Sequence, residues 1–215
     1  MLQGMTADFP EHSISVILGK SGCGKTTLLR VLAGFEQADS GEVNVPPHEK
    51  IGMVFQEPRL MPWLTVWKNM TLGVPKEKQD EEVLRSLLRV VGLTGFETAY
   101  PSQLSGGMQQ RVALARALAY DPELILMDEP FAALDHFTRE AMQNELIDIF
   151  SQQKKSILFV THSVDEALLI GQKILVVSHG GIALEFHLSE YPYPRDILSP
   201  ELIQVKRSIL AAIKQ

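Results

Sequence analysis

The chain has 215 residues, of which 45% are apolar and 21% charged, with 20 lysines and arginines against 26 aspartates and glutamates. This composition excludes a mainly disordered chain and a collagen-like one, because there is ample apolar surface to bury. The net charge of −6 argues against a nucleic-acid-binding protein that relies on a positive field, and the single cysteine excludes an internal disulfide.

The N-terminal residues MLQGMTADFPEHS contain neither a basic stretch nor an apolar one, so no signal peptide is expected. No apolar run approaches the roughly 18 to 20 residues that span a bilayer. Any association with a membrane is therefore expected to go through a partner or a surface.

Short apolar runs alternate with stretches of helical periodicity, which predicts an α/β fold with a mainly parallel sheet. The predicted buried strands are Ser13–Leu18, Ile51–Phe55, Leu124–Asp128, Ser156–Val160 and Lys173–Ser178. The predicted helices in this part of the pattern are Lys25–Ala33, Gln109–Ala119, Phe137–Ser151 and Val164–Ile170. Gly34 is placed to end the first of these helices.

The middle of the chain, residues 58–103, holds no convincing buried strand. Apolar residues recur at helical spacing in Gln79–Val91, which predicts a helical insertion packed on the sheet. Trp63 and Trp67 fit the core of this insertion, and the alternative is an exposed aromatic anchor for another protein. A further helix is predicted at Ser199–Ile213.

A glycine-rich loop follows the first predicted strand and opens the first helix. It matches the pattern G-x-x-x-x-G-K-[ST], in which backbone N–H groups at a helix N-terminus face phosphate oxygens. The residues expected to bind the phosphates are Gly19, Lys20, Ser21, Gly22, Cys23, Gly24, Lys25, Thr26 and Thr27. Lys25 would bring a positive charge to the β- and γ-phosphates, and the Thr26 hydroxyl would bind Mg²⁺. Cys23 is interpreted as a small filler residue rather than a redox or metal-binding thiol.

Another apolar run ends in two carboxylates, Asp128 and Glu129, where α/β proteins bind their ligands. Asp128 is expected to hold Mg²⁺, and Glu129 to orient or deprotonate a water that attacks the γ-phosphorus. His162 and Gln56 also follow predicted strands. His162 would contact the γ-phosphate or the attacking water, and Gln56 would contact both Mg²⁺ and that water. The other histidines are interpreted as surface or capping residues: His12, His48, His136, His179 and His187.

A second glycine-containing loop, Leu104-Ser105-Gly106-Gly107-Met108, leads directly into a predicted helix. Ser105 is suited to cap this helix, and Gly106 and Gly107 expose backbone N–H groups at its start. The chain therefore carries a second candidate anion site, which is unusual for a nucleotide kinase or a GTPase.

These motifs, in this order, resemble those of the ATP-binding cassette (ABC) ATPases over nearly the whole chain. The resemblance implies a P-loop NTPase fold with a RecA-like core, and ATP and Mg²⁺ as cofactors. It identifies Gln56 as the Q-loop residue, Ala133-Leu134-Asp135 as the D-loop and His162 as the switch histidine, with Asp135 contributing to the nucleotide site. It also implies a homodimer in which the signature residues Ser105, Gly106 and Gly107 act on the ATP of the partner chain.

The resemblance further implies a single ABC ATPase domain over residues 1–215. Residues 1–57 and 104–190 would form the nucleotide-binding core, 58–103 the helical subdomain and 191–215 a short C-terminal tail. The family usually places an adenine-stacking aromatic residue well upstream of the phosphate loop, and 18 residues precede Gly19. The N-terminal β-subdomain is therefore expected to be truncated, with a lower affinity for ATP, and Met1 to be an internal methionine of a longer product.

The segment Met53–Val66 and the tail around Arg195 and Pro200 are similar to ATPases of nitrate, sulfonate and taurine importers, and also to importers of pyrimidine-type vitamin precursors. This similarity implies an integral-membrane permease as partner, a solute-binding protein indirectly, and a position at the cytoplasmic face of the plasma membrane. One alternative is a non-transport ABC ATPase of DNA repair, cluster assembly or translation. Another is a nucleotide-binding module weakened by its short N-terminus, although Lys25 and Glu129 are intact.

Overall fold

The computed structural model describes residues 3–132, 134–153, 155–178 and 180–214. A six-stranded sheet in the order β2-β3-β4-β1-β5-β6 forms its centre. The parallel strands are β1 (Ile14–Gly19), β2 (Ile51–Val54), β3 (Leu124–Asp128), β4 (Ser156–Thr161) and β5 (Lys173–Ser178). Each coincides with a predicted strand to within one residue at either end, so the expected α/β fold with a mainly parallel sheet is confirmed.

The sixth strand, β6 (Gly181–His187), runs antiparallel to β5 at one side of the sheet. The sequence pattern does not predict this strand. Residues 183–185 are exposed, so the segment lacks the continuous apolar run by which a strand buried on both faces is recognised.

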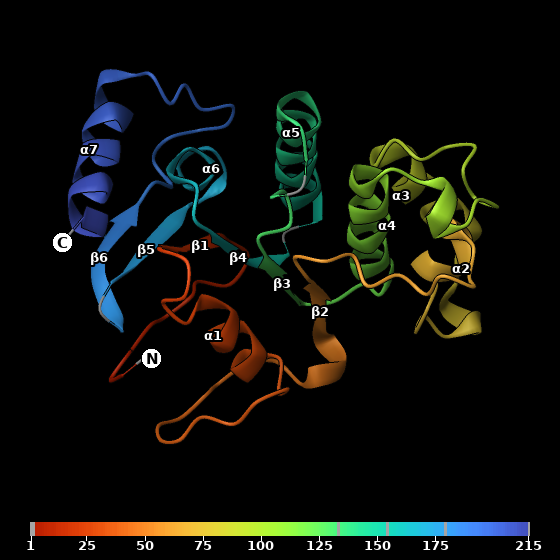
Figure 1. Ribbon diagram of the computed structural model, residues 1–215, viewed down its shortest axis with the longest axis horizontal. Helices are drawn as coiled ribbons and strands as arrows, with labels where there is room; N and C mark the ends of the chain where they lie inside the picture. Colours follow the sequence, from red (N-terminus) through yellow and green to blue (C-terminus); the bar gives the residue numbers. More distant parts are fainter. Residues whose placement is uncertain (1–2, 133, 154, 179, 215) are drawn as a thin grey trace.

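Helices cover both faces of the sheet (Figure 1). They are α1 (Lys25–Leu32), α2 (Val66–Met70), α3 (Glu81–Val90), α4 (Gly106–Ala119), α5 (His136–Gln153), α6 (Val164–Ile170) and α7 (Pro200–Lys214). Short 3₁₀ turns lie at His48–Lys50, Lys76–Lys78 and Pro101–Gln103. Helix α1 covers one face, α5, α6 and α7 lie on the other, and α2, α3 and α4 form a lobe beside β2. None of the described helices combines the length and apolar character that a membrane span requires.

The alternation of side chains along the strands divides the core into two layers. Leu126 and Leu158 point to the α1 face and pack in a small cluster with Leu29. Their neighbours Met127 and Phe159 point to the opposite face and belong to the larger cluster, which continues into the helical lobe. One apolar core therefore joins the lobe to the sheet.

Gly34 ends α1 as predicted, with a φ of +74°. A Cβ atom at this position would lie 2.4 Å from the His48 ring, so both the backbone conformation and the space favour glycine.

The two tryptophans of the helical lobe have different environments. Trp67 packs against the large core cluster, and the Arg85 guanidinium lies 5.5 Å from the centre of its ring. Trp63, in contrast, is 70% exposed. The buried Asn69 holds the turn that carries it, because its amide bonds to the backbone of Met61 and Leu64. The core interpretation is therefore right for Trp67 and wrong for Trp63.

The C-terminal tail is anchored to α6 by two side chains. Arg195, which is 8% exposed, donates hydrogen bonds to the carbonyl oxygens of Leu168, Gly171, Leu188 and Tyr191. Tyr193 donates its hydroxyl to the Ile170 carbonyl and stacks with the Arg195 guanidinium, 4.5 Å from the ring centre. These bonds satisfy carbonyl groups at the end of α6 that have no partner within the helix.

Tyr193→Phe should destabilise the protein by about 1 kcal/mol at neutral pH, because the buried Ile170 carbonyl loses its donor. The penalty should shrink as the pH rises. Burial raises the pKa of Tyr193 to about 12, whereas a tyrosine in the unfolded chain titrates near ~10. Between these values unfolding releases a proton, so the stability of the unaltered protein falls with pH and that of the variant does not.

Urea unfolding at pH 7 and pH 10.5 measures this difference. Tyr120→Phe, which removes a phenol at 37% exposure, serves as the matched control and should change stability little at either pH. A loss of stability in Tyr193→Phe that is the same at both pH values would contradict a raised pKa for the buried Tyr193 hydroxyl.

Candidate active site

The predicted site residues converge at the carboxyl end of the parallel strands. Leu18 pairs with Thr161, and Asp128 pairs with Val160, so the phosphate loop, the acidic pair and His162 follow neighbouring strand ends. Gln56 lies two residues beyond β2, on the same side of the sheet, with its side chain exposed.

The phosphate loop turns tightly between β1 and α1. Gly22 and Gly24 have φ values of +81° and +102°, a conformation that a residue with a Cβ rarely adopts. At Gly19 a Cβ would lie 2.7 Å from the Val177 carbonyl oxygen and 2.9 Å from the Cys23 sulfur. Cys23 is half-buried and packs against the small core cluster, which agrees with its interpretation as a filler residue.

Lys25 lies inside this loop and is only 5% exposed. Its ammonium group donates hydrogen bonds to the carbonyl oxygens of Gly19, at 2.8 Å, and Lys20, at 2.9 Å. The loop therefore holds a buried positive charge at the N-terminus of α1, where the helix dipole also attracts anions.

Thr26 and Asp128 form a donor set suited to a hard cation. The Thr26 hydroxyl lies 3.2 Å from Asp128 Oδ1, although the two residues are 102 positions apart in the sequence. Burial, with the Glu129 charge in a smaller role, raises the pKa of Asp128, and the Thr26 hydrogen bond opposes this shift. Hydroxyl and carboxylate oxygens are ligands that Mg²⁺ prefers, so the residues present fit that ion.

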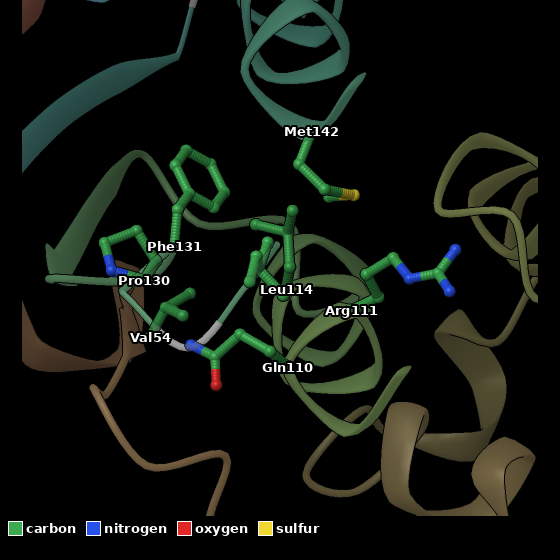
Figure 2. Close-up of a pocket in the computed structure, with 8 residues that line it drawn as sticks. Val54, Gln110, Arg111, Leu114, Pro130, Phe131 and Met142 are labelled. Carbon is green, nitrogen blue, oxygen red and sulfur yellow. The ribbon is translucent and has the colours of Figure 1, made fainter. Parts of the chain in front are cut away.

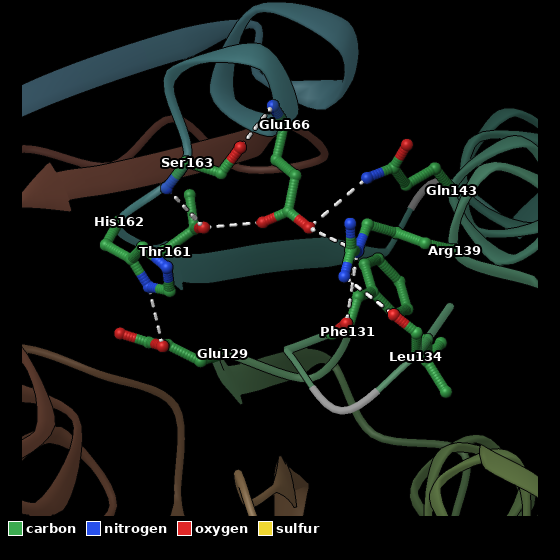
Figure 3. A network of polar contacts seen from close by, with 9 residues as sticks. All are labelled: Glu129, Phe131, Leu134, Arg139, Gln143, Thr161, His162, Ser163 and Glu166. Carbon is green, nitrogen blue, oxygen red and sulfur yellow. Dashed lines mark hydrogen bonds and ion pairs between the residues drawn. The ribbon is translucent and has the colours of Figure 1, made fainter. Parts of the chain in front are cut away.

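Glu129 and His162 form a pair across the ends of β3 and β4 (Figure 3). The His162 Nδ1 atom lies 2.8 Å from Glu129 Oε2. Glu129 has a φ of +45°, which is uncommon for a residue with a side chain, and its N–H donates to the Val160 carbonyl at 2.9 Å. Such strain is found at functional sites, where the surrounding structure holds it in place.

The signature residues lie at the start of α4. The Ser105 hydroxyl accepts a hydrogen bond from the Met108 N–H at 3.2 Å, which confirms that Ser105 caps this helix. The helix begins at Gly106, three residues before the predicted start, because the cap adds a turn. Within the described part of the chain, no hydrogen bond joins the signature residues to the phosphate loop.

Asp135 lies at the start of α5, where its carboxylate accepts a hydrogen bond from the Thr138 N–H at 3.0 Å. Hydrogen bonds from Thr138 lower the pKa of Asp135. Four of the remaining histidines are exposed as expected, namely His12, His48, His136 and His187. The expectations for Met1, Ala133 and His179 fall outside the described residues.

Sequence reasoning missed the side chains that hold the segment around Gln56. Arg116 of α4 donates to the carbonyls of Pro58, at 2.9 Å, and Arg59, at 3.0 Å. Gln110, earlier on the same helix, donates to the Phe55 carbonyl at 3.0 Å. Both side chains come from α4, the helix that begins with the signature. Their hydrogen bonds therefore join α4 to residues 55–59 around Gln56.

A small cavity lies beside Gln110 (Figure 2). Its lining residues are Val54, Gln110, Arg111, Leu114, Pro130, Phe131, Leu134 and Met142. It includes none of the predicted phosphate-binding residues, so it is distinct from the predicted nucleotide site.

Comparison with known proteins agrees with this geometry. The ABC transporter family model matches residues 2–132. An uncharacterized ABC transporter ATP-binding protein of Methanocaldococcus jannaschii is 45% identical, over 99% of this chain and 84% of its own length. An aliphatic sulfonates import ATP-binding protein, SsuB of Bacillus cereus, is 38% identical, over 98% of this chain and 87% of its own.

Among solved structures, a dimeric ATP-binding cassette in a post-hydrolysis state with ADP and Pi is similar to this chain, with a TM-score of 0.78 and 32% identity. The similarity covers 87% of this chain and 90% of that one. With a phosphate loop, an acidic pair and a signature helix placed as described, the chain belongs to the ABC transporter family and is an ABC ATPase.

Proposed function

We propose that this ABC ATPase energises an importer of a small sulfonate-type solute through a separate permease. The observation that carries the ATPase chemistry is the convergence of Lys25, the Thr26–Asp128 pair and the Glu129–His162 pair at one end of the sheet. The similarity to sulfonate importer ATPases over 98% of the chain supports the transport role.

Each group has a defined task in this proposal. Lys25 exchanges the Gly19 and Lys20 carbonyls for the β- and γ-phosphate oxygens, which the loop N–H groups also bind. Thr26, Asp128 and Gln56 hold Mg²⁺, whose charge offsets that of the phosphates when it is bound.

Glu129 acts as the base in this scheme. It orients a water for in-line attack on the γ-phosphorus and accepts its proton, and His162 fixes the Glu129 carboxylate by the 2.8 Å contact. His162 is then directed at the γ-phosphate or the attacking water.

We also propose a homodimer with two sandwiched ATP molecules. Ser105, Gly106 and Gly107 of one chain complete the nucleotide site of the other, with Asp135 near the same junction. Two observations support this arrangement: the signature residues make no hydrogen bond to their own phosphate loop in the described part of the chain, and the similar cassette is dimeric. The core would comprise residues 1–57 and 104–190, with 58–103 as the helical subdomain and 191–215 as the tail.

The permease and a solute-binding protein complete the importer, and the chain would lie at the cytoplasmic face of the plasma membrane. Reconstitution of the chain with the permease of a sulfonate importer tests this role. ATP hydrolysis by the complex should rise when the binding protein loaded with an alkanesulfonate is added, but not when the unloaded protein is added. A complex whose hydrolysis ignores every loaded binding protein, and which accumulates no solute, would refute the importer role and leave the ATPase assignment intact.

A further inference from the structure

A buried carboxylate, Glu166, lies in the first turn of α6 and has no role in the chemistry proposed above. It is 8% exposed. Its two oxygens are bound on different sides (Figure 3): the Thr161 hydroxyl donates to one, and the Gln143 amide donates to the other over 3.4 Å. A buried charge is costly unless it is bonded, so the contacts of Glu166 indicate what it holds in place.

On one side Glu166 fixes the end of β4. The Thr161 side chain donates to Glu166 and accepts from the Ser163 N–H at 3.0 Å. These two bonds hold the backbone on both sides of His162. Because His162 in turn contacts Glu129, the Glu166 carboxylate is linked to the orientation of this pair through the Thr161 hydroxyl.

On the other side Glu166 contacts Arg139 of α5. The Arg139 Nε atom lies 3.7 Å from Glu166 Oε1. The same guanidinium donates to the Phe131 carbonyl at 3.2 Å and to the Leu134 carbonyl at 2.7 Å. Arg139 therefore holds the backbone at Phe131 and at Leu134, the residue before Asp135.

We propose that Glu166 and Arg139 are positioning residues that hold His162 and the segment before Asp135 in a fixed relation. A displacement of one segment is then passed to the other through hydrogen bonds on either side of the Arg139–Glu166 ion pair. This inference rests on the proposed function, which directs His162 to the ATP of its own chain and places Asp135 at the dimer junction. The pair thus couples the γ-phosphate contact to the junction within one chain.

Thr161→Val tests the first half of this network, because it removes the hydroxyl with little change in volume. Glu166→Ala, by contrast, leaves Arg139 without its ion pair and endangers folding. In Thr161→Val we expect kcat for ATP hydrolysis to fall roughly ten- to a hundred-fold, with KM for ATP unchanged, because the reacting groups are misplaced while binding contacts remain. Thr161→Ser keeps the hydroxyl and should restore the rate.

Thr71→Val is the matched control. It removes a threonine hydroxyl that donates to the Trp67 carbonyl at 3.0 Å in the lobe beside β2. We expect kcat to stay unchanged. Arg139→Met should lower kcat as Thr161→Val does, and the double variant should lose less activity than the product of the two single losses. A loss of kcat in the double variant that equals the product of the two single losses would overturn the coupling between Thr161 and Arg139.

The ¹³Cε1 resonance of His162 in the nucleotide-free protein gives a readout that needs no turnover. The resonance is assigned by its absence from the spectrum of His162→Gln. It should shift in Thr161→Val and in Arg139→Met but not in Thr71→Val. An unmoved resonance in Arg139→Met would overturn the positioning role. If the unaltered protein hydrolyses no ATP while the resonance moves in both variants, the proposed function fails and the positioning role stands.

Discussion

ATP hydrolysis should fall by roughly 10²–10⁴-fold in the Glu129→Gln variant, while ATP binding persists. The amide keeps the shape of the side chain and its place beside His162, but it cannot accept a proton from water. Lys25 and the Thr26–Asp128 pair are untouched, so the nucleotide contacts remain. With hydrolysis blocked, the ATP-bound dimer should accumulate.

Phosphate release and light scattering measure the two halves of this prediction. In ATP the scattering mass should rise from one chain of 24.0 kDa to two, and it should not rise in ADP. Glu82→Gln, an exposed carboxylate of α3, is the matched control and should leave the hydrolysis rate unchanged. Hydrolysis at the normal rate in Glu129→Gln would show that the base is a different group.

The second large effect is expected at Lys25. Lys25→Met keeps the length of the side chain and removes its charge, so the loop loses its buried cation. Hydrogen bonds to a charged group contribute about 1.5–3 kcal/mol each. We therefore expect ATP to bind roughly ten- to a hundred-fold more weakly.

Calorimetric titration with ATP measures the affinity, and circular dichroism checks that the variant is folded. Lys76→Met removes an exposed charge of the helical lobe and controls for the change in net charge. Equal affinities for Lys25→Met and Lys76→Met would exclude a direct contact between Lys25 and the phosphates.

The parts of the site that the sequence predicts are those whose pattern is local. The phosphate loop is recognisable because its glycines and Lys25 are neighbours in the chain and follow a buried strand. Asp128 and Glu129 are recognisable for the same reason, since the apolar run before them predicts both the strand and its end. The parallel order of the strands then brings these local motifs together.

What the sequence does not predict depends on contacts between distant residues. Arg139 and Glu166 are 27 positions apart, on different helices, and each resembles an ordinary charged residue of a helix surface until the fold brings them together. The prediction for Trp63 is wrong because its exposure depends on the turn that Asn69 holds, which has no periodic pattern. The half-exposed β6 escapes prediction because its partner β5 determines its register.

The central position of β1 also bears on how the protein is made. A ribosome completes β1 and the phosphate loop early, yet Ile14 pairs with Ile157 and Ser15 with Lys173, which are synthesised much later. At ~5–20 residues per second, this strand waits on the order of ten to thirty seconds for its first neighbour. Nucleotide therefore has no formed site to bind until β4 and β5 have been synthesised, and only a chain that extends beyond these strands can gain stability from ATP.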